Sequence, residues 1–335
     1  MMKRRFHIVL FVTAIFLLAA MLISLIWGTY SISVKDVFNT LFGQGSKLQN
    51  TTIFQLRLPR IFIALFVGIA LSTAGCVLQS VTRNPLAEPG MIGINAGAAL
   101  AVVLFISIKS TAYYSALSAA TVFMIPVFAL AGSLLSSLLI YSLAYKKGIS
   151  PNRLILTGIG VNAGINAFIT LYQLNMSKGD YNQALTWISG SLWGSSWIYF
   201  IFLAPAVLLL TIIVLYKSRT LDVYALGDET ASGLGVSVQR ESRILLLLAV
   251  ALSALATSVA GNIAFLGLLG PHIAKKLVGA AHKRQIITGA MISAALIIAA
   301  DSISRNLFSP LEVPVGITLS IVGVPYFIYL MLKEK

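Results

Sequence analysis

Charged residues are scarce in this sequence. Only 10% of its 335 residues are Asp, Glu, Lys or Arg, whereas 58% are hydrophobic and the mean hydropathy is +0.91. A soluble globular domain carries about 25% charged residues. The shortage of charge therefore excludes a cytosolic enzyme and a disordered chain, and it indicates a membrane protein.

Cysteine is almost absent, since Cys76 is the only one. A single thiol inside an apolar segment can build neither an intramolecular disulfide nor a cysteine-based zinc site. Histidine is also rare, and the three histidines are too scattered to suggest an iron site. We therefore expect no resident metal and no cofactor.

Acidic residues are fewer than basic ones, 10 against 24, which gives a formal net charge of +14. Such an excess can indicate a nucleic-acid binder, but here the basic residues stand singly or in short clusters between long apolar stretches. That distribution is typical of membrane-protein loops. We expect the lipid bilayer as a partner and no nucleic acid.

Several signatures of catalysis and energy coupling are missing. The chain has no G-x-x-x-x-G-K-[ST] loop and no H-E-x-x-H motif, so it cannot bind ATP through a Walker site. A membrane protease would need Ser237 with His272 or His282 as its base, but Ser237 falls in a polar loop. No predicted span carries a charged residue near its middle, which disfavours an ion-driven transporter. We expect that the chain is not an enzyme.

Long apolar intervals are what the chain has in abundance. Nine stretches lack Asp, Glu, Lys and Arg and approach the roughly 20 residues that cross a bilayer. The stretch 244–274 is long enough to split at Gly261-Asn262, which makes ten spans. With both termini in the cytoplasm, this topology assigns 17 of the 24 Lys and Arg residues to the cytoplasmic side. The sequence predicts an all-α polytopic membrane protein.

The longest charged segment on the cytoplasmic side is 218–241, between spans six and seven. Its apolar residues recur at roughly helical spacing, Asp228 and Glu229 suit a first helical turn, and Gly233 or Gly235 can end the helix. The sequence predicts a short surface helix here. Spacing alone leaves two alternatives open, a solvated loop or a docking element for a cytoplasmic partner.

Two further polar features interrupt the apolar pattern. Residues 83–90 join two spans through two prolines, and irregular backbone at such a position is tolerated only inside protein or beside a cavity. On the outer side, Arg57, Arg60 and Arg305 stand next to span ends. They are either interface anchors, with Asp301 and Arg305 spaced i,i+4 for a pair, or receptors for carboxylates of an extracytoplasmic partner.

Five motifs occur in order along nearly the whole chain: Arg57-Leu-Pro-Arg60, QSVTRNPLAEPGMIGINAG from residue 79, ALGDETASGLGV from 225, GNIAFLGLLGPHIAKKLVG from 261, and VPVGITLSIVGVPYFIYLML from 313. Together they resemble the FecCD family, the permease subunits of ATP-binding-cassette importers for iron-siderophores, haem and vitamin B12. The resemblance implies a single permease domain, 1–335, of about ten transmembrane helices with cytoplasmic termini and type II importer architecture.

The resemblance also implies partners and a location. The permease would work as a homodimer or heterodimer with a second permease subunit, on two cytoplasmic ATP-binding subunits, and an extracytoplasmic substrate-binding protein would supply it. Its place would be the bacterial cytoplasmic membrane, which it crosses many times. One departure from many relatives is Lys275-Lys276 after the Pro-His pair, where they have arginine; lysine keeps the charge but loses bidentate geometry.

Roles for individual residues follow from the resemblance as well. Segment 218–241 would be the coupling loop whose helix sits in a cleft of the ATPase, through Asp228, Glu229, Ala231, Leu234 and Gly235. Contacts with glutamates of the binding protein would come from Arg57, Arg60 and Arg305. The cytoplasmic gate and the pathway would include Asn84, Pro85, Leu86, Asn162, Asn166 and Gln79, the last of which could equally be a helix-packing amide.

The expected function is import of a ferric siderophore, with ATP hydrolysed by a partner chain. No ligand-reading residue separates this cargo from vitamin B12 or haem, which stay the alternative within the family. An ion-driven secondary transporter is the alternative of a different class, and a charged residue in the middle of a span or an inverted repeat would favour it.

Overall fold

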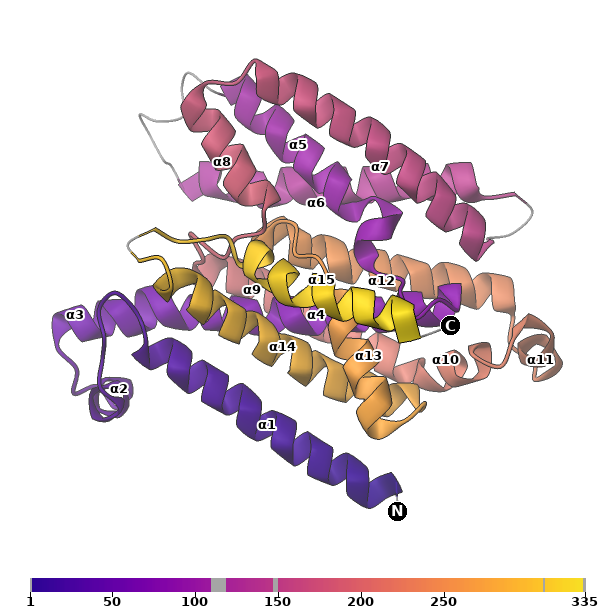
Figure 1. Ribbon diagram of the computed structural model, residues 1–335, viewed down its shortest axis with the longest axis horizontal. Helices are drawn as coiled ribbons and strands as arrows, with labels where there is room; N and C mark the ends of the chain where they lie inside the picture. Colours follow the sequence, from indigo (N-terminus) through magenta and orange to yellow (C-terminus); the bar gives the residue numbers. More distant parts are fainter. Residues whose placement is uncertain (1, 110–118, 147–149, 310, 334–335) are drawn as a thin grey trace.

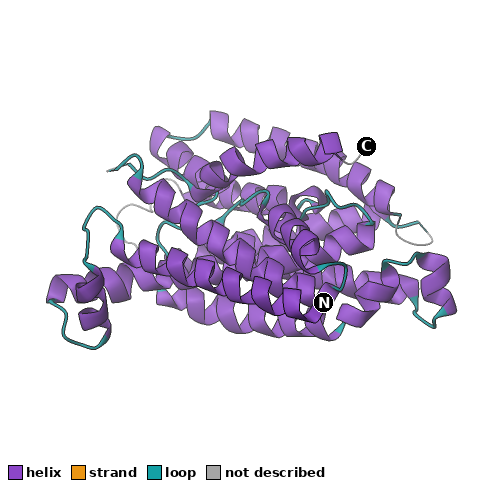
Figure 2. Cartoon of the chain, turned by 60° about the horizontal axis from the view of Figure 1, so that its bottom comes forward, coloured by secondary structure: helices purple, strands orange, loops and turns teal. Residues whose placement is uncertain are grey.

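The computed structural model describes residues 2–109, 119–146, 150–309 and 311–333. Within these ranges the regular elements are helices and none is a strand (Figure 2). The all-α fold class expected from the composition is therefore confirmed.

Most helices are α-helical, with one π-helical segment, η1, and one 3₁₀ segment, η2. In chain order they are α1 (Met2–Ile26), α2 (Val34–Leu41), α3 (Lys47–Asn50), η1 (Thr51–Arg57), α4 (Leu58–Thr82), η2 (Pro89–Ile92), α5 (Ile94–Lys109), α6 (Ala119–Ala144), α7 (Pro151–Leu174), α8 (Lys178–Ile188), α9 (Trp197–Tyr216), α10 (Ser218–Tyr224), α11 (Asp228–Gly233), α12 (Val238–Ala260), α13 (Leu266–Val278), α14 (His282–Asn306) and α15 (Val315–Lys333).

Eight helical stretches of the described chain are long and apolar enough to cross a membrane. They contain α1, α4, α6, α7, α9, α12, α14 and α15, while α5 and α13 are apolar but shorter. The expected split at Gly261-Asn262 is confirmed, because α12 ends at Ala260 and α13 begins at Leu266. The expectation of about ten crossings corresponds to the eight long helices together with α5 and α13.

The two ends of the bundle differ in charge. Both described chain termini lie at the same end as α10 and α11, opposite α2 and α3 (Figure 1). Arg83, Lys217, Lys275 and Lys333 lie at or next to helix ends there. We call this the basic end and the opposite one the outer end. The arrangement agrees with an even number of crossings and with basic residues kept on the cytoplasmic side.

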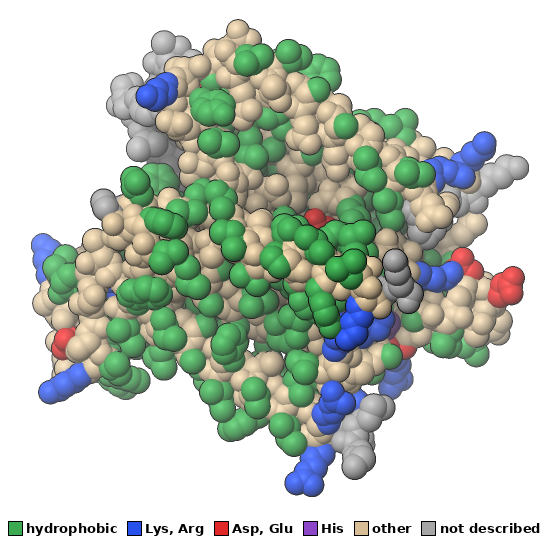
Figure 3. Space-filling model, viewed as in Figure 1, with side chains coloured by type: hydrophobic (Ala, Val, Ile, Leu, Met, Phe, Trp, Pro, Cys, Tyr) green, Lys and Arg blue, Asp and Glu red, His purple; other side chains and the backbone are tan. Residues whose placement is uncertain are grey.

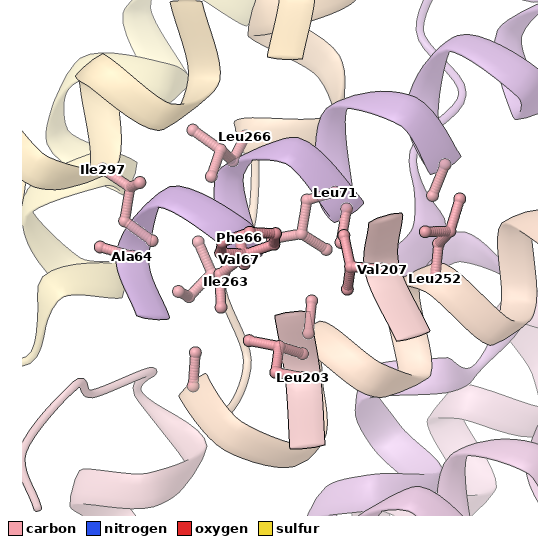
Figure 4. Close-up of a cluster of buried hydrophobic side chains, with 14 of the residues drawn as sticks. Ala64, Phe66, Val67, Leu71, Leu203, Val207, Leu252, Ile263, Leu266 and Ile297 are labelled. Atoms are coloured by element: carbon pink, nitrogen blue, oxygen red, sulfur yellow. The ribbon is translucent and has the colours of Figure 1, made fainter. Parts of the chain in front are cut away.

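Helix α4 is the centre of the larger hydrophobic core. Of its most apolar stretch 83% is buried, and the helix packs against α9, α12, α13 and α14. Figure 4 shows Val67 and Leu71 of α4 close to Leu203 and Val207 of α9 and to Leu266 of α13. Lipid is as apolar as these side chains, so close van der Waals packing is what holds such helices together.

A second, smaller core joins α5, α6, α7 and α8. Helices α5 and α6 approach closely at Gly97 and Gly132, where a Cβ on either glycine would collide with the other's carbonyl oxygen. These four helices form a layer on one side of α12 (Figure 1). The surface is hollowed between this layer and the rest of the molecule, and carboxylate atoms show inside the hollow (Figure 3).

Helix α7 is the least covered of the long helices. Only 17% of its apolar stretch is buried, and Gly160 and Gly164 have open space where a Cβ would stand. The G-x-x-x-G spacing of this pair favours helix packing. Within this chain, however, no described atom packs against either position.

Candidate functional site

Helix α11 is a short exposed helix at the basic end. Gly227 precedes it with a φ of 105°, which side chains other than glycine rarely adopt. Asp228 and Glu229 occupy the first turn, where a carboxylate is favoured by the helix dipole. The helix ends at Gly233, so the predicted surface helix is confirmed, while its role in coupling stays a prediction.

The side of α11 that faces away from the bundle is both acidic and apolar. Ala231 is buried and anchors the helix, whereas Asp228 and Glu229 are exposed. Leu226 and Leu234, which flank the helix, are each 61% exposed. Large apolar side chains this exposed outside the spans are suited to burial against another protein.

The loop after α4, which contains the predicted gate residues, has a defined local structure. Arg83 ends α4 in the left-handed conformation, with a φ of 51°. The side chain of Asn84 then accepts a hydrogen bond from the backbone N–H of Leu86 at 2.9 Å, across Pro85. This turn makes residues 84–86 a compact unit, and all three are partly buried.

The predicted pathway residues separate into two groups. Asn162 of α7 donates to the carbonyl of Gly90 at 3.2 Å, so it ties α7 to the irregular loop. Asn166, one turn later, is exposed. Gln79 donates to the carbonyl of Leu268 at 3.5 Å, a contact that the helix-packing alternative expects, while its role in the pathway stays a prediction.

Glu88 is an acidic residue that the sequence analysis did not single out. Its carboxylate accepts a hydrogen bond of 3.0 Å from the backbone N–H of Phe265, the residue that precedes α13 with a φ of 65°. Burial raises the pKa of Glu88 above its ordinary value. The sequence-based expectation concerned charged residues in the middle of spans, and Glu88 lies instead in the loop between α4 and α5. The sequence feature that could have pointed to Glu88 is its place before Pro89 and Gly90. Irregular backbone leaves N–H groups without helical partners, and a carboxylate can accept hydrogen bonds from them.

A chain of amides continues from this point. Asn95 of α5 donates to the side-chain oxygen of Asn262 at 2.6 Å, and it accepts from the hydroxyl of Thr257 at 3.1 Å. Together with Glu88, these residues join the loop after α4 to α5 and to the break between α12 and α13. Polar groups of the two irregular segments are thus hydrogen-bonded to each other. Interior loops of membrane proteins need such partners because no water is available to them.

Arg57 lies nearly enclosed at the outer end, and its role in docking stays a prediction. It is 5% exposed, and its guanidinium donates to the backbone carbonyls of Leu25 and Tyr30. Both acceptors lie at or just after the end of α1. Arg57 therefore ties the turn after α1 to the end of η1.

Arg60 and Arg305 are brought together by Asp301. Arg60 lies 2.8 Å from this carboxylate and 3.0 Å from that of Glu312. Arg305 lies 3.2 Å from Asp301, so the predicted i,i+4 pair is confirmed, and it donates to the hydroxyl of Ser24 at 2.8 Å. The side chains of Arg60 and Arg305 are only 12% and 10% exposed, whereas that of Glu312 is 38% exposed. Docking of a partner on these arginines stays a prediction.

No resident metal site is evident in the part of the chain that the structure describes. Nowhere in these ranges do three or more His, Cys, Asp or Glu side chains gather as they would around a metal ion.

The whole chain is similar to known transport proteins. The model of the FecCD transport family matches residues 16–333. The iron(3+)-hydroxamate import system permease protein FhuG of Bacillus subtilis is 48% identical over 98% of this chain and 97% of its own length. The ferric enterobactin transport system permease protein FepG of Escherichia coli is 35% identical over 97% of each.

The fold agrees with a solved relative. A structure described as an inward-facing conformation of a metal-chelate type ABC transporter superposes with a TM-score of 0.84 and 29% identity, covering 97% of this chain and 98% of that chain. On its sequence motifs, its helical architecture and these matches, the chain belongs to the FecCD transport family.

Proposed function

We propose that the chain is the permease subunit of an ATP-binding-cassette importer that carries a ferric siderophore of the hydroxamate class across the bacterial cytoplasmic membrane. The observation that carries this proposal is the 48% identity, over nearly the full length of both chains, to a permease for iron(3+)-hydroxamate. A bulky neutral or weakly charged chelate suits an interior lined by amides and small residues better than a tight ionic site does.

We propose that energy enters through α11. Asp228, Glu229, Leu234 and Gly235 are exposed at the basic end, and the buried Ala231 anchors the helix. Such a helix can insert into a cleft of a cytoplasmic ATP-binding subunit. The segment 218–241 would then be the coupling loop, and ATP would be hydrolysed in the partner.

We propose a second permease subunit against α7. Its open Gly160 and Gly164 positions, with the exposed Phe168 and Leu171 on the same helix, offer a surface that another helix can approach closely. Asn166 on this exposed helix would then border a pathway formed between two subunits. A homodimer and a heterodimer both satisfy this geometry.

We propose that the substrate-binding protein docks at the outer end through Arg60 and Arg305. Both are held beside Asp301, and Glu312 covers the outward side of Arg60. A carboxylate of the partner would exchange with Glu312, which is the most exposed member of the cluster. Arg57 would support this surface from behind through its bonds to the turn after α1.

The transport cycle follows from differences in affinity between conformations. ATP binding changes the distance between the two partner ATPases, α11 moves with them, and the helices around the pathway shift between outward and inward opening. ATP and cargo can shift this equilibrium only through their different affinities for the two states. The compact turn at residues 84–86 is the proposed cytoplasmic gate.

An uptake measurement tests the proposal. Cells that lack the subunit are compared with complemented cells for uptake of radiolabelled ferric hydroxamate, ferric citrate, vitamin B12 and haem, and a hydrolysis-deficient ATPase partner serves as the control. Loss of ferric hydroxamate uptake in both the deletion and the control supports the proposal. Loss of vitamin B12 or haem uptake instead would show that the cargo is one of the other substrates carried within the family.

The half-buried Glu88, whose pKa is raised, is an observation that favours an ion-driven mechanism, because interior carboxylates often mark proton coupling. The same cells distinguish an ATP-driven importer from an ion-driven transporter. Uptake that survives a hydrolysis-deficient partner but stops with a protonophore would identify a secondary transporter and refute ATP coupling.

A further inference from the structure

The last turn of α4 is attached to the α10–α11 segment at two places. Ser80 and Arg83 belong to this turn, which leads directly into the turn at 84–86. Each is linked to an acidic residue of the segment, Ser80 indirectly and Arg83 directly. The two attachments differ in construction, since one is a single exposed ion pair and the other passes through the buried His282.

The first attachment is an exposed ion pair. The guanidinium of Arg83 lies 2.5 Å from the carboxylate of Asp228, the first residue of α11, and stacks over the ring of Tyr224 at 5.5 Å. The two charged side chains are 40% and 60% exposed. Since Arg83 ends α4 and precedes Asn84, a displacement of Asp228 acts on the first residue of the loop.

The second attachment passes through the buried His282 of α14, although its end on α10, Asp222, has a side chain that is 42% exposed. Asp222 of α10 accepts two hydrogen bonds from His282, one from its backbone N–H at 2.8 Å and one from ring Nδ1 at 2.7 Å. The other ring nitrogen contacts the hydroxyl of Ser80 at 2.5 Å, and Ser80 donates to the carbonyl of Cys76. His282 is 5% exposed and is the first residue of α14. This chain holds α4, α10 and α14 in one arrangement.

A cavity beside the exposed pair leaves room for movement. It measures about 180 Å³, and its lining includes Arg83, Asp228 and Tyr224 together with Tyr145, which follows α6, and residues of α12 such as Arg243. Arg243 donates to the hydroxyl of Tyr145 at 2.6 Å and lies over its ring, and among the described residues it forms no ion pair with α11. The cavity is therefore bordered by one cation that is paired with α11 and by one that is not.

We propose that the Arg83–Asp228 ion pair transmits the displacement of α11 to the gate turn at residues 84–86, while the Asp222–His282–Ser80 chain, held by several hydrogen bonds around the buried His282, serves as the fixed pivot. Arg83 is a positioning residue in this scheme, because it touches neither cargo nor ATP. The inference rests on the proposed function of α11 as the element that docks on the ATPase.

The test is a series at Arg83, a position outside the proposed docking residues. The assembled permease with its ATPase is reconstituted in liposomes together with the substrate-binding protein, and three quantities are measured: the amount of ATPase bound, basal ATP hydrolysis, and chelate transported per ATP hydrolysed. Arg83→Lys keeps the charge, Arg83→Gln removes it, and Arg83→Glu reverses it. Arg243→Gln is the matched control, an arginine on the same cavity that is paired with Tyr145 instead of α11.

We expect bound ATPase and basal hydrolysis to stay unchanged throughout the series. Transport per ATP falls roughly two- to fivefold in Arg83→Gln, the range that exposed ion pairs span. It falls further in Arg83→Glu, and it stays near the original value in Arg83→Lys and Arg243→Gln. A merely structural role would not separate transport from hydrolysis in this graded way.

Unchanged transport per ATP in Arg83→Gln and Arg83→Glu would overturn the inference, and so would an equal loss in Arg243→Gln. In both of these cases the unaltered permease would still bind the ATPase and transport its cargo. Failure of the proposed function looks different, because the unaltered permease itself would then show no ATP-dependent transport.

Discussion

Arg60 and Asp301 form a bidentate ion pair across the outer ends of α4 and α14. The Nε atom of Arg60 lies 3.0 and 3.1 Å from the two carboxylate oxygens of Asp301, and a terminal nitrogen lies 2.8 Å from one of them. Arg305 shares the same carboxylate. Two arginines that stand 245 positions apart in the sequence numbering thus depend on one buried acid.

Replacing Asp301 leaves both arginines without their common partner. Because the carboxylate is only 3% exposed, Asp301→Ala is expected to destabilise the protein by about 3–5 kcal/mol, as breaking a buried pair does. The measurement is thermal unfolding of the purified protein in detergent. Glu312→Gln, at the exposed member of the cluster, is the control and is expected to change stability by no more than about 1 kcal/mol. Equal melting temperatures for Asp301→Ala and the unaltered protein would contradict this expectation.

Glu312 competes with any acidic partner for Arg60. Removing its charge in Glu312→Gln is therefore expected to tighten binding of the substrate-binding protein by up to about fivefold, while Arg60→Gln weakens it. Affinity measured on immobilised permease checks both. Asp36→Asn is the matched control, since Asp36 is an exposed acid at the same end whose partner is Ser33. Tighter binding in both acid variants would indicate a general charge effect rather than a docking site at Arg60.

Glu88 gives a prediction for stability against pH. Its pKa is raised above the ordinary value of 4.5, mainly by burial, so the folded protein binds this proton more tightly than the unfolded chain. Stability contributed by the protonated group is then lost as pH rises from about 4.5 through the raised pKa. Glu88→Gln, which keeps an acceptor for the Phe265 N–H without a charge, is expected to lack this pH dependence.

Glu88→Ala separates the hydrogen bond from the charge. It leaves the N–H of Phe265 without an acceptor, which is expected to cost about 1–3 kcal/mol relative to Glu88→Gln at every pH. Melting temperatures of the three proteins between pH 4 and pH 8 test both statements, the pH range being set around the ordinary carboxyl value. Parallel pH curves for Glu88 and Glu88→Gln would show that the carboxyl does not titrate in this way.

Charge reversal on α11 tests its docking role. Asp228→Lys combined with Glu229→Lys is expected to release the ATPase subunit, because it places two cations where a first helical turn favours anions and where the partner would meet acids. Co-purification measures the loss. Arg240→Gln, an exposed charge at the start of α12, is the control. Full retention of the ATPase together with substrate-stimulated hydrolysis would refute the coupling assignment.

Two glycines distinguish packing within the chain from packing between chains. Gly97→Leu is expected to prevent normal folding, since a Cβ there collides with the backbone of Gly132. Gly160→Leu meets open space in this chain and is expected to fold, yet to weaken the association of two permease subunits. Size-exclusion chromatography in detergent separates the outcomes. A Gly160→Leu protein that dimerises normally would place the subunit interface elsewhere.

Local patterns explain why much of the architecture could be predicted. The apolar intervals that mark spans, the break at Gly261-Asn262, the first turn of α11 and the i,i+4 pair of Asp301 and Arg305 all depend on residues within a few positions of each other. The family motifs are local as well, which is why the family could be named before the fold was known. The docking, coupling and gate roles carried over from the resemblance stay predictions.

The contacts at the candidate site could not be predicted from such local patterns. Arg57 was expected at a surface and is instead bound to carbonyls after α1, because only the packing of α1 beside η1 decides what covers it. Glu88 was passed over because its partner Phe265 lies 177 residues away. The choice between a pathway role and a packing role for Gln79 likewise depended on α13 passing beside α4.

The sequence by itself determined that this is an all-helical membrane protein of the FecCD family, where its spans lie, and that a short acidic helix projects from one end. Those properties follow from composition and from periodicities of a few residues, which act on the chain wherever it folds. Only the tertiary structure decided which polar groups meet, such as Arg83 with Asp228, 145 residues away. A polar group inside a helix bundle needs a partner, and which partner it finds depends on how distant helices pack against one another.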